Sequence, residues 1–593
     1  MCGIVGYLNF KRKIEPPEIV EMRDSLRHRG PDDEGVGFYE NDSIALGHRR
    51  LSFLDLSPAG RQPLCNEDET IWLILNGEIY NYVELRSELE KQQHVFKTHT
   101  DTEVIVHGYE QWGYDVVNRL KGMFAFALLD LKQKKVFLAR DRFGIKPLYY
   151  HLSDSCFVFA SELKAILKCR EVKREIDFTS FADYFTYRYI PSPKTIWNNI
   201  AKLPPAHFLV YDYVERKNEL KEYWKISFEN HKADAAALAK EVGAMLSESV
   251  AIHARSDVPV GSFLSGGYDS SAVVYYLTQH GYKPDTFSIG FKGWDNSEHQ
   301  YAQLVADQLN VPLTITMEDD ASHELLDIMP DVYDEPIADI SILPTWLVSH
   351  AAVKKVKAVM SGEGADELFG GYSWQKQFFA MHYELKWHQK LAHALAHKPA
   401  FDTVEFYANA MAMGRFNTAE LKKLISPELH HSIADDAEWF YRKHFDASLS
   451  PLKSIQRMDM KCFMGELVLV KIDRASMANS LEVRVPFLDH ELFEKVLRVK
   501  ETVYYKPDST KFLLYENIKH FLPEKILNRA KQGFVGPDVF YMNMQRYQKI
   551  MESSRLIREG IVQKSYCENL LATKDHWRLW KFAVMEKWYG RWS

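Results

Sequence analysis

Residues 258–280 read VPVGSFLSGGYDSSAVVYYLTQH. The apolar run 258–264 predicts a strand, and 271–280 predicts a helix. Between them, Gly266 and Gly267 predict a tight turn whose amide groups face an anion, with the positive end of the helix dipole beside it. A plain turn with a Ser or Asp helix cap is the alternative. The sequence contains no GxxxxGK[ST] motif, so the turn is not a Walker P-loop.

The turn also carries polar side chains. Ser265, Ser270 and Ser271 offer hydroxyl donors to an anion. Asp269 cannot itself attract a phosphate, but its carboxylate could hold the Mg²⁺ ion that does. The turn is therefore a candidate site for a nucleotide and its metal ion.

A second glycine-rich loop, SGEGADELFGGY (361–372), follows another predicted strand and carries Glu363, Asp366 and Glu367. Loops at the carboxyl ends of parallel strands line the ligand crevice of such sheets. Two glycine-rich loops at one crevice predict a site for a nucleotide, its Mg²⁺ and a catalytic carboxylate. A flexible acidic turn is the alternative interpretation.

Strands and helices alternate through the surrounding chain, which predicts a parallel α/β sheet. The predicted strands are 258–264, 286–291, 311–317 and 356–361, and the predicted helices are 237–254, 271–280, 298–310 and 342–355. The remainder, 373–593, reads as mainly helical.

Residues 1–205 have a different pattern, with short apolar runs broken by Gly, Pro, Asn and Asp. Strands are predicted within 44–56, 70–82, 122–131 and 135–144, and helices over 82–93 and 102–113. This mixture predicts an α+β domain with helices over antiparallel sheets. The stretch from 206 to 235 is less patterned and is interpreted as a linker between two domains, 2–205 and 236–593.

The chain opens MCGIVGYLNF (1–10), with a thiol at Cys2. One interpretation is a small apolar residue at the start of a strand. The other is a nucleophile, because Met1 is removable before a small residue. Cys2 would then carry a thiol and a free α-amine with a pKa of about 7.7–8.0. Such an amine can take the proton from its own thiol.

Four polar stretches in the first domain would complement a thiol nucleophile. They are RHRGPDD (27–33), HRRLSFLD (48–55), NGEIYN (76–81) and THTDTE (98–103). Together with Cys2 they offer a nucleophile, amide donors for an oxyanion, an Arg for a carboxylate and acids for an ammonium group. Hydrolysis of the side-chain amide of an α-amino acid needs these groups.

Bulk composition excludes several classes of protein. The 593 residues carry a formal net charge of −7, which gives no support to a nucleic-acid partner. Six cysteines without a CxxC spacing do not predict a disulfide framework, and no zinc-binding pattern is visible. Neither an early apolar segment of signal-peptide type nor an apolar run of about 18 residues occurs. We therefore expect a cytosolic protein without a membrane partner.

Taken together, these motifs resemble those of glutamine-hydrolysing asparagine synthetases over nearly the whole chain. The specific pieces are MCGIVG, HRGPD, NGEIYN, ARDRFGIKPLYY, SGGYDSS, SGEGADELFGGY, KIDRASMANSLEVRVPFLD and RAKQGF. The resemblance implies an N-terminal-nucleophile glutaminase domain with an αββα sandwich. It also implies a synthetase domain of the PP-loop ATP-pyrophosphatase type with a helical C-terminal part. The implied substrates are glutamine, aspartate and ATP, with Mg²⁺ as the metal ion. A homodimer is compatible with the resemblance.

The resemblance assigns roles to residues of the matching motifs. In the glutaminase domain, Cys2 resembles the nucleophile that forms a glutamyl thioester. Asn76 and Gly77 resemble its oxyanion hole. The glutamine pocket would consist of Arg50, Leu51, Ser52, Phe53, Leu54, Asn76, Gly77, Glu78 and Asp101. In that pocket Arg50 would pair with the α-carboxylate of glutamine, and Glu78 and Asp101 would hold its ammonium group.

In the synthetase domain the nucleotide contacts would be Leu264, Ile289, Ser361 and Gly362, and the pyrophosphate loop would be Ser265, Gly266, Gly267, Asp269 and Ser270. Asp269 and Asp366 would be the Mg²⁺ ligands. Glu363 resembles the acid associated with acyl-adenylate formation and attack by ammonia. Lys511 resembles the lysine that supports the adenylation transition state.

Four stretches depart from the usual family pattern. Tyr268 replaces an aliphatic residue in the pyrophosphate loop, and DNSEHQYA, VPLTITMED and QGFVGP differ from their usual counterparts. These departures leave open an amide transferase acting on another carboxylate, such as a peptidoglycan precursor or a natural-product acid. A β-lactam-forming synthetase would not need Cys2, and a regulatory protein without catalysis would not need Asp269, Glu363 and Lys511.

Overall fold

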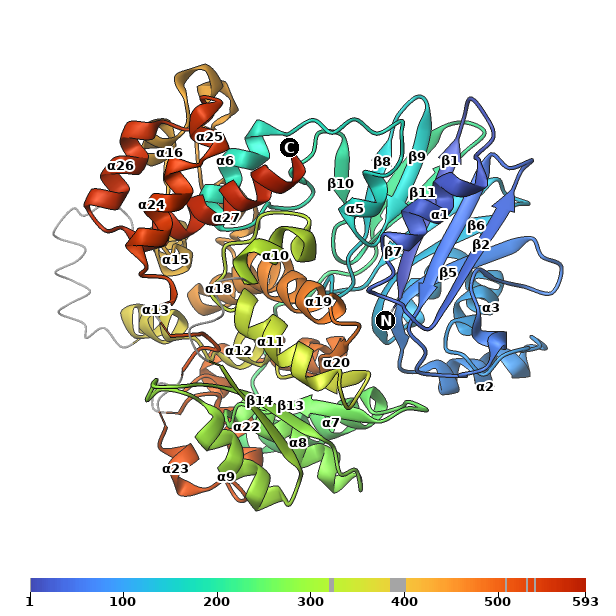
Figure 1. Cartoon of the computed structure of the whole chain (residues 1–593). Helices are drawn as coiled ribbons and strands as arrows, with labels where there is room; N and C mark the ends of the chain where they lie inside the picture. Colours follow the sequence, from blue (N-terminus) through green and yellow to red (C-terminus); the bar gives the residue numbers. More distant parts are fainter. Residues whose placement is uncertain (1, 319–324, 384–401, 507–508, 530–531, 538–539) are drawn as a thin grey trace.

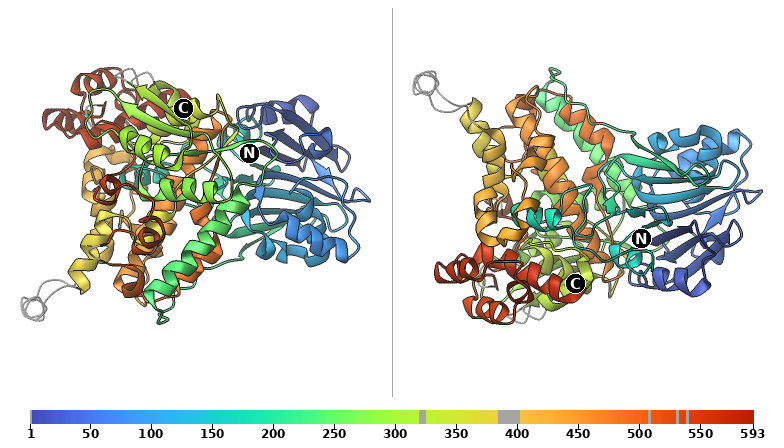
Figure 2. Two further views of the ribbon diagram at one scale, coloured as in Figure 1. Left: turned by 90° about the horizontal axis from the view of Figure 1, so that it is seen from below. Right: turned by 90° about the horizontal axis from the view of Figure 1, so that it is seen from above.

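The computed structural model describes residues 2–318, 325–383, 402–506, 509–529, 532–537 and 540–593. Figure 1 shows the N-terminal strands, in blue and teal, as one part of the molecule. A green parallel sheet and a group of orange and red helices form the rest. Both views in Figure 2 show the N-terminal part packed against one side of the remainder.

Two six-stranded sheets form the N-terminal part, and their paired strands run antiparallel. The first has the order β10-β8-β9-β1-β3-β2, with β1 (Gly3–Asn9), β2 (Asp33–Tyr39), β3 (Ile44–Arg50), β8 (Tyr149–Leu152), β9 (Cys156–Ala160) and β10 (Ile200–Lys202). The second has the order β12-β11-β7-β6-β5-β4, with β4 (Leu64–Cys65), β5 (Ile71–Ile79), β6 (Gly122–Asp130), β7 (Lys135–Arg140), β11 (His207–Asp212) and β12 (Lys217–Glu222).

Alternation of side chains explains how the two sheets stack. Ile4 and Leu8 of β1 join Ile74 of β5 in a core between the sheets, because successive strand residues face opposite sides. Leu73 and Leu75, the neighbours of Ile74, instead pack with the helical layer on the outer side of the second sheet. That layer contains α2 (Tyr82–Lys91) and α3 (Glu103–Trp112), while α1 (Pro16–Asp24) and α5 (Leu163–Ile166) pack against the first sheet. The expected αββα sandwich is confirmed.

The stretch predicted as a linker differs from the expectation. Strands β11 and β12 lie within residues 206–235, and β11 pairs with β7 so that both strands extend the second sheet. The sequence of β12, KNELKE, carries little apolar alternation because this edge strand is mostly exposed. We therefore propose that the first domain continues through Glu222.

The second domain is built on a five-stranded parallel sheet with the order β15-β14-β13-β16-β17. Its strands are β13 (Val260–Phe263), β14 (Thr286–Phe291), β15 (Leu313–Glu318), β16 (Ala358–Met360) and β17 (Glu482–Arg484). The connecting helices include α7 (Ala235–His253), α8 (Tyr268–Gln279), α9 (His299–Leu309) and α11 (Ile342–Ala352). The chain steps outward from β13 to β15 and then crosses back to β16. The loops after β13 and β16 therefore flank the point where ligands bind in such sheets.

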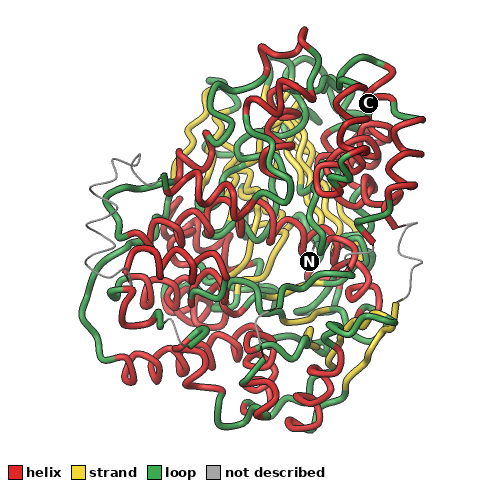
Figure 3. Tube along the Cα trace, turned by 90° about the vertical axis from the view of Figure 1, so that its left-hand side faces the viewer, coloured by secondary structure: helices red, strands yellow, loops and turns green. Residues whose placement is uncertain are grey.

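Most of the remaining chain is helical, as expected, although residues 384–401 lie outside the described part. The main helices are α10 (Leu325–Tyr333), α12 (Ala365–Phe369), α13 (Ser373–Tyr383), α15 (Thr403–Met411), α16 (Thr418–Leu424), α17 (Trp439–His444), α18 (Pro451–Met458), α19 (Leu469–Met477), α20 (His490–Leu497), α22 (Phe512–Ile518), α24 (Met544–Glu552), α26 (Lys564–Ala572) and α27 (His576–Trp592). The C-terminus lies among these helices in Figure 3. Across the described residues, none of the helices has the length and apolar character that crossing a membrane requires.

One helix from the first part of the chain belongs spatially to the helical region. In Figure 1, α6 (Phe178–Tyr187) lies beside α27. The Tyr184 hydroxyl donates to the Lys581 carbonyl at 2.8 Å, and Lys581 Nζ donates to the Phe185 carbonyl at 2.8 Å. The chain then returns to the first sheet as β10, so the two domains are joined by more than one crossing.

A buried ionic network holds the domains together. Arg29 Nη1 donates to Glu162 Oε1 at 2.7 Å, and its two terminal nitrogens donate to Asp473 of α19 at 2.9 and 3.0 Å. Arg474, the next residue of α19, lies 2.8 Å from Glu162 Oε1. Arg29 Nε also donates to the Cys2 carbonyl at 3.1 Å. The start of β1 is therefore positioned by the same side chain that ties the domains together.

Candidate active site

The predicted nucleophile lies at the start of β1, beside the end of β5. Cys2 is buried, and its backbone N–H donates to Asn76 Oδ1 at 3.2 Å. The other atom of this amide, Asn76 Nδ2, is buried and has no hydrogen-bond partner among the described residues. A buried donor left unpaired costs free energy, so its presence beside a thiol fits a waiting oxyanion. Burial raises the pKa of the Cys2 thiol, and the Arg50 guanidinium opposes this rise.

Gly77 must be glycine where β5 approaches β6. Its φ is +155°, and a Cβ at this position would lie 2.1 Å from the Met123 carbonyl oxygen. The close pairing of Gly77 with Phe124 therefore depends on the missing side chain. Asn76 and Gly77 thus lie together near Cys2, as the oxyanion-hole prediction requires.

The predicted glutamine loop follows β3. Arg50 Nη2 donates to the carbonyls of Leu54 and Asp55 at 3.0 and 2.7 Å, so the loop itself holds the guanidinium in place. The Ser52 amide donates to Asp32 Oδ2 at 2.9 Å. Leu51 and Phe53 are buried in a small apolar cluster with residues of the second domain, Ala358 and Met477. The loop is therefore also an interface.

Two buried carboxylates complete the predicted glutamine pocket. Asp101 Oδ2 accepts a hydrogen bond from the Ile79 amide at 2.7 Å, and burial raises the pKa of Asp101 to about 6. Burial also raises the pKa of Glu78 well above its usual value, and the nearby carboxylates of Glu482 and Asp101 add to this rise. A cation between Glu78 and Asp101 would favour their charged forms. The pair therefore fits an ammonium group.

The second predicted site lies at the carboxyl ends of β13 and β16. Ser270 Oγ lies 3.2 Å from Ser265 Oγ and accepts a hydrogen bond from the Ser265 amide at 3.2 Å, which closes the turn before α8. A Cβ on Gly362 would lie 2.7 Å from Cβ of Asp269. The two glycine-rich loops are therefore in contact, as the crevice prediction requires.

Lys511 joins the two loops. Its Nζ lies 2.5 Å from Asp269 Oδ2 and 2.7 Å from Asp366 Oδ1. The two carboxylates predicted as Mg²⁺ ligands therefore both contact the ammonium group of Lys511 in this structure. The Lys511 side chain is buried, so its positive charge is little screened by solvent.

Glu363 is partly buried, and its Oε2 atom is buried without a hydrogen-bond partner among the described residues. Burial raises the pKa of Glu363, whereas Lys471 lowers it. The Lys471 ammonium donates to Ser341 Oγ at 2.8 Å. Lys471 is the first residue of the motif KIDRASMANSLEVRVPFLD but is not among the predicted site residues. Its proximity to Glu363 makes it a candidate contact for an acidic acceptor.

The predicted nucleotide contacts lie on neighbouring strands of the parallel sheet or directly after them. Leu264 directly follows β13 and Ile289 lies within β14. Both are buried, and the Leu264 amide donates to the Phe287 carbonyl at 2.9 Å. The Ser361 amide donates to the Arg484 carbonyl at 2.9 Å. The loop after β16 is therefore attached to β17, a strand that sequence reasoning missed because it is short and rich in charge.

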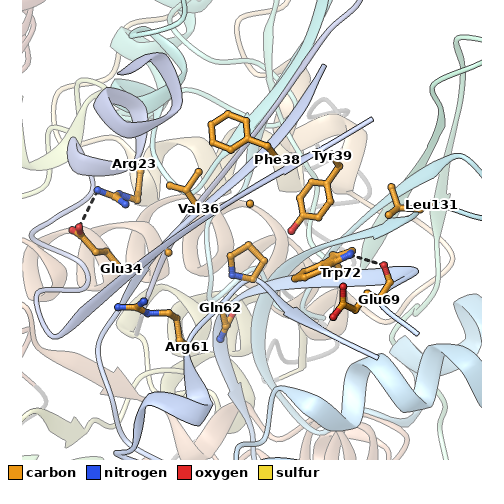
Figure 4. A pocket seen from close by; sticks show the side chains of 13 residues that line it. Arg23, Glu34, Val36, Phe38, Tyr39, Arg61, Gln62, Glu69, Trp72 and Leu131 are labelled. Carbon is orange, nitrogen blue, oxygen red and sulfur yellow. Dashed lines mark hydrogen bonds and ion pairs between the residues drawn. The ribbon is translucent and has the colours of Figure 1, made fainter. Parts of the chain in front are cut away.

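A separate surface cavity of about 680 Å³ lies on the N-terminal domain. Figure 4 shows Arg23, Glu34, Tyr39, Arg61 and Trp72 around it. None of the residues that line it was predicted for either site, so we assign it no part in the reaction.

Comparison with known proteins agrees with this arrangement. Residues 1–224 match a family model described as glutamine amidotransferase domain, and residues 241–590 match one described as asparagine synthase. Glutamine-hydrolysing asparagine synthetase 1 of Bacillus subtilis strain 168 is 32% identical, with an alignment that covers 100% of this chain and 96% of that protein. The chain belongs to the glutamine-hydrolysing asparagine synthetase family.

Two further relatives differ from this one in their sequence identity to the chain. Putative glutamine-hydrolysing asparagine synthetase 2 of Methanocaldococcus jannaschii is 36% identical over 82% of this chain and 100% of that protein. Amidase chry2 of Gibberella zeae is 28% identical over 96% of this chain and 93% of that protein. The chain is therefore an amidating enzyme of the glutamine-dependent asparagine-synthase type, with an ATP-using synthetase domain.

Arg484 contacts both candidate sites of this asparagine-synthetase family member. Its side chain donates to the His253 carbonyl at 2.7 Å and to Glu482 at 2.6 Å, and it lies 3.4 Å from Glu78 Oε2. Its own carbonyl accepts the hydrogen bond from Ser361 in the other site. One buried residue therefore contacts the predicted glutamine pocket and the predicted nucleotide loop.

We expect Arg484→Lys to lower kcat/KM for glutamine hydrolysis about tenfold or more, because one ammonium cannot replace all the bonds of a planar guanidinium. Lysine keeps the positive charge, but its different shape and reach would remove the 3.4 Å contact of the guanidinium with Glu78. The measurement is glutamate formation as a function of glutamine concentration. Arg498→Lys is the control, since Arg498 is a more exposed arginine paired with Glu494. Unchanged kinetics in a folded Arg484→Lys protein would contradict the assigned link.

Proposed function

We propose that the chain hydrolyses glutamine at Cys2 and uses the ammonia to convert the side-chain carboxylate of aspartate into an amide. The products would be asparagine, glutamate, AMP and pyrophosphate. The observation that carries this proposal is the convergence of Asp269, Asp366 and Lys511 beside the glycine-rich turn of a parallel sheet. A chain with a thiol site alone would not need this cluster.

In the glutaminase half, removal of Met1 would free the α-amine that takes the thiol proton. The Cys2 sulfur would attack the side-chain amide carbon of glutamine, releasing ammonia and forming a thioester that water then hydrolyses. The unpaired Asn76 Nδ2 supports a role as a donor to the oxyanion. Arg50 would bind the α-carboxylate of glutamine, and Glu78 and Asp101 would bind its ammonium group.

Ammonia would pass between the domains without entering bulk water. The apolar contact of Leu51 and Phe53 with Ala358 and Met477 supports this, because it places the glutamine loop directly against the parallel sheet. The buried bonds of Arg29 and Arg484 keep the two sites in fixed relation.

In the synthetase half, a carboxylate oxygen of aspartate would attack the α-phosphorus of ATP, and pyrophosphate would leave. Amides of the turn from Ser265 to Ser270 would bind the leaving pyrophosphate. Lys511 would stabilise the charge that develops during adenylation. Ammonia would then attack the acyl carbon of β-aspartyl-AMP, with Glu363 receiving a proton as AMP departs.

Magnesium fits this half of the enzyme. Asp269 and Asp366 are oxygen ligands that already approach one shared point, and Mg²⁺ is held by one or two carboxylates together with substrate phosphates. When bound there it would neutralise charge on the phosphates of ATP. Lys511 would then move its contacts toward the nucleotide.

A different acceptor carboxylate is the second candidate. Tyr268 stands where the family usually has an aliphatic residue, and its hydroxyl donates to the Leu527 carbonyl at 3.0 Å. An aliphatic side chain could not make this bond, which ties the turn of residues 265–270 to the segment around Leu527. The Gibberella zeae relative is named an amidase, which also supports substrates beyond aspartate.

The deciding experiment measures pyrophosphate and AMP release with glutamine, ATP and a panel of free and peptide-linked acids. We expect aspartate to give full turnover, because a site built for its ammonium and α-carboxylate leaves those partners unpaired with other acids. AMP formation only with a larger acid would transfer the assignment to the second candidate. ADP formation would overturn the adenylation mechanism.

Cys2→Ala tests the division of labour between the domains. Synthesis from glutamine should fall at least about 10³-fold, because the nucleophile is lost. Synthesis from added ammonium should remain, since the ATP loops lie in the other domain. Product formation from each nitrogen source is the measurement, and equal loss of both in a folded variant would contradict the division.

Glu363→Gln tests the proposed acid-base group. Synthesis with either nitrogen source should fall about 100-fold, while glutamine hydrolysis continues. Glu367→Gln is the control from the same loop, because the Glu367 carboxylate is held by the Tyr372 hydroxyl at 2.6 Å. Unchanged product formation by Glu363→Gln would remove Glu363 from the mechanism.

A further inference from the structure

A cluster of histidine and glutamate side chains lies in the helical layer outside the second sheet. His107 and Glu110 belong to α3, and His94 follows α2, in the lower right of Figure 1. One ligand atom from each of the three residues lies within 4.8 Å of the others. None of the three belongs to the glutamine pocket or to the nucleotide site.

The distances within the cluster suit a shared metal ion. Glu110 Oε2 lies 3.0 Å from His107 Nδ1 and 3.6 Å from His94 Nδ1. A separation of 3.6 Å is too long for a hydrogen bond. Zinc bonds of about 2.0–2.2 Å place neighbouring ligands of a tetrahedral site about 3.3–3.6 Å apart. The three atoms therefore approach the spacing of ligands around one ion.

The opposite atoms of His94 and Glu110 each have a hydrogen-bond partner, whereas His107 Nε2 is buried without one among the described residues. His94 Nε2 lies 3.2 Å from Gln111 Oε1, and His107 Nε2 lies 3.5 Å from Glu103 Oε1. Glu110 Oε1 accepts a hydrogen bond from Asn66 Nδ2 at 2.9 Å. Histidines that bind metal usually donate their other ring N–H to such an oxygen, which fixes the tautomer and the ring orientation.

Glu67 offers a fourth ligand at the open side of the cluster. Its Oε1 lies 3.9 Å from His107 Nδ1, and its side chain is partly exposed. Two imidazoles with carboxylate oxygens form a borderline donor set that suits zinc better than magnesium or calcium. The four side chains come from three segments that are separate in sequence: the turn after β4, the loop after α2, and α3.

We propose that His94, His107 and Glu110 bind a divalent transition-metal ion, with zinc the best match, and that Glu67 or water completes the coordination. The ion would cross-link these three segments over the second sheet. This site is independent of the proposed amidation chemistry, so either can fail without the other.

A protonated His107 paired with Glu103 and Glu110 is the competing explanation. Burial lowers the pKa of His107, but the neighbouring carboxylates of Glu103 and Glu110 outweigh burial and raise the pKa to about 9. Both explanations fit the position of His94, whose Nε2 contacts Gln111 and whose Nδ1 lies near Glu110. Metal binding and protonation compete for the same nitrogen, so a direct binding measurement separates them.

The test uses the full-length protein, freed of metal with a chelator and then titrated with zinc chloride by calorimetry. We expect one high-affinity equivalent per chain and a thermal midpoint that rises with zinc concentration. His94→Gln and Glu110→Gln should each weaken binding at least 100-fold. His231→Gln is the matched control, because His231 is an exposed histidine paired with Glu229.

X-ray absorption of the zinc-loaded protein identifies the ligands. Nitrogen and oxygen scattering, unchanged in Cys2→Ala, would support the site. Sulfur scattering, binding that survives both ligand substitutions, or no zinc binding by the folded protein would overturn it. Circular dichroism of each variant distinguishes a lost ligand from a lost fold.

Discussion

The buried guanidinium of Arg29 is the interaction on which the arrangement of the molecule depends. It is fully buried, it pairs with Glu162 of its own domain and with Asp473 of the other, and it holds the Cys2 carbonyl. Burying one of these charges without a partner would cost several kcal/mol, so the pairing of Arg29 with Asp473 stabilises one relative position of the two domains. Domain orientation and the position of the thiol are therefore set together.

The two candidate sites differ in how their carboxylates are paired. In the N-terminal domain, burial raises the pKa of both Glu78 and Asp101, so the pocket carries carboxylates that a cationic substrate would stabilise. In the second domain, Lys511 already pairs with Asp269 and Asp366. In the proposed mechanism, Mg²⁺ would replace Lys511 beside these two carboxylates. Arg484 belongs to both regions, because its side chain reaches Glu78 while its carbonyl holds Ser361.

Local sequence patterns predicted much of this fold. The alternation of apolar runs and helical segments from 237 to 361 predicted the parallel sheet, since strand and helix periodicity are properties of neighbouring residues. The glycine-rich loops after β13 and β16 were predicted to meet, and the structure brings Gly362 against Asp269. The pattern failed where a strand carries charge: β12 was interpreted as part of a linker, and β17 was missed.

By itself the sequence predicted most of the helices and strands, the order of the two domains and the candidate site residues at Cys2 and in the two loops. Only the tertiary structure decided which charged side chains form ion pairs with one another. Lys511 lies 242 residues from Asp269, and Arg29 lies 444 residues from Asp473. His94 and His107 met as a candidate metal site although the cysteine pattern predicted no zinc. Such pairings depend on how segments that are far apart in sequence pack together. The periodicity of neighbouring residues carries no information about that packing.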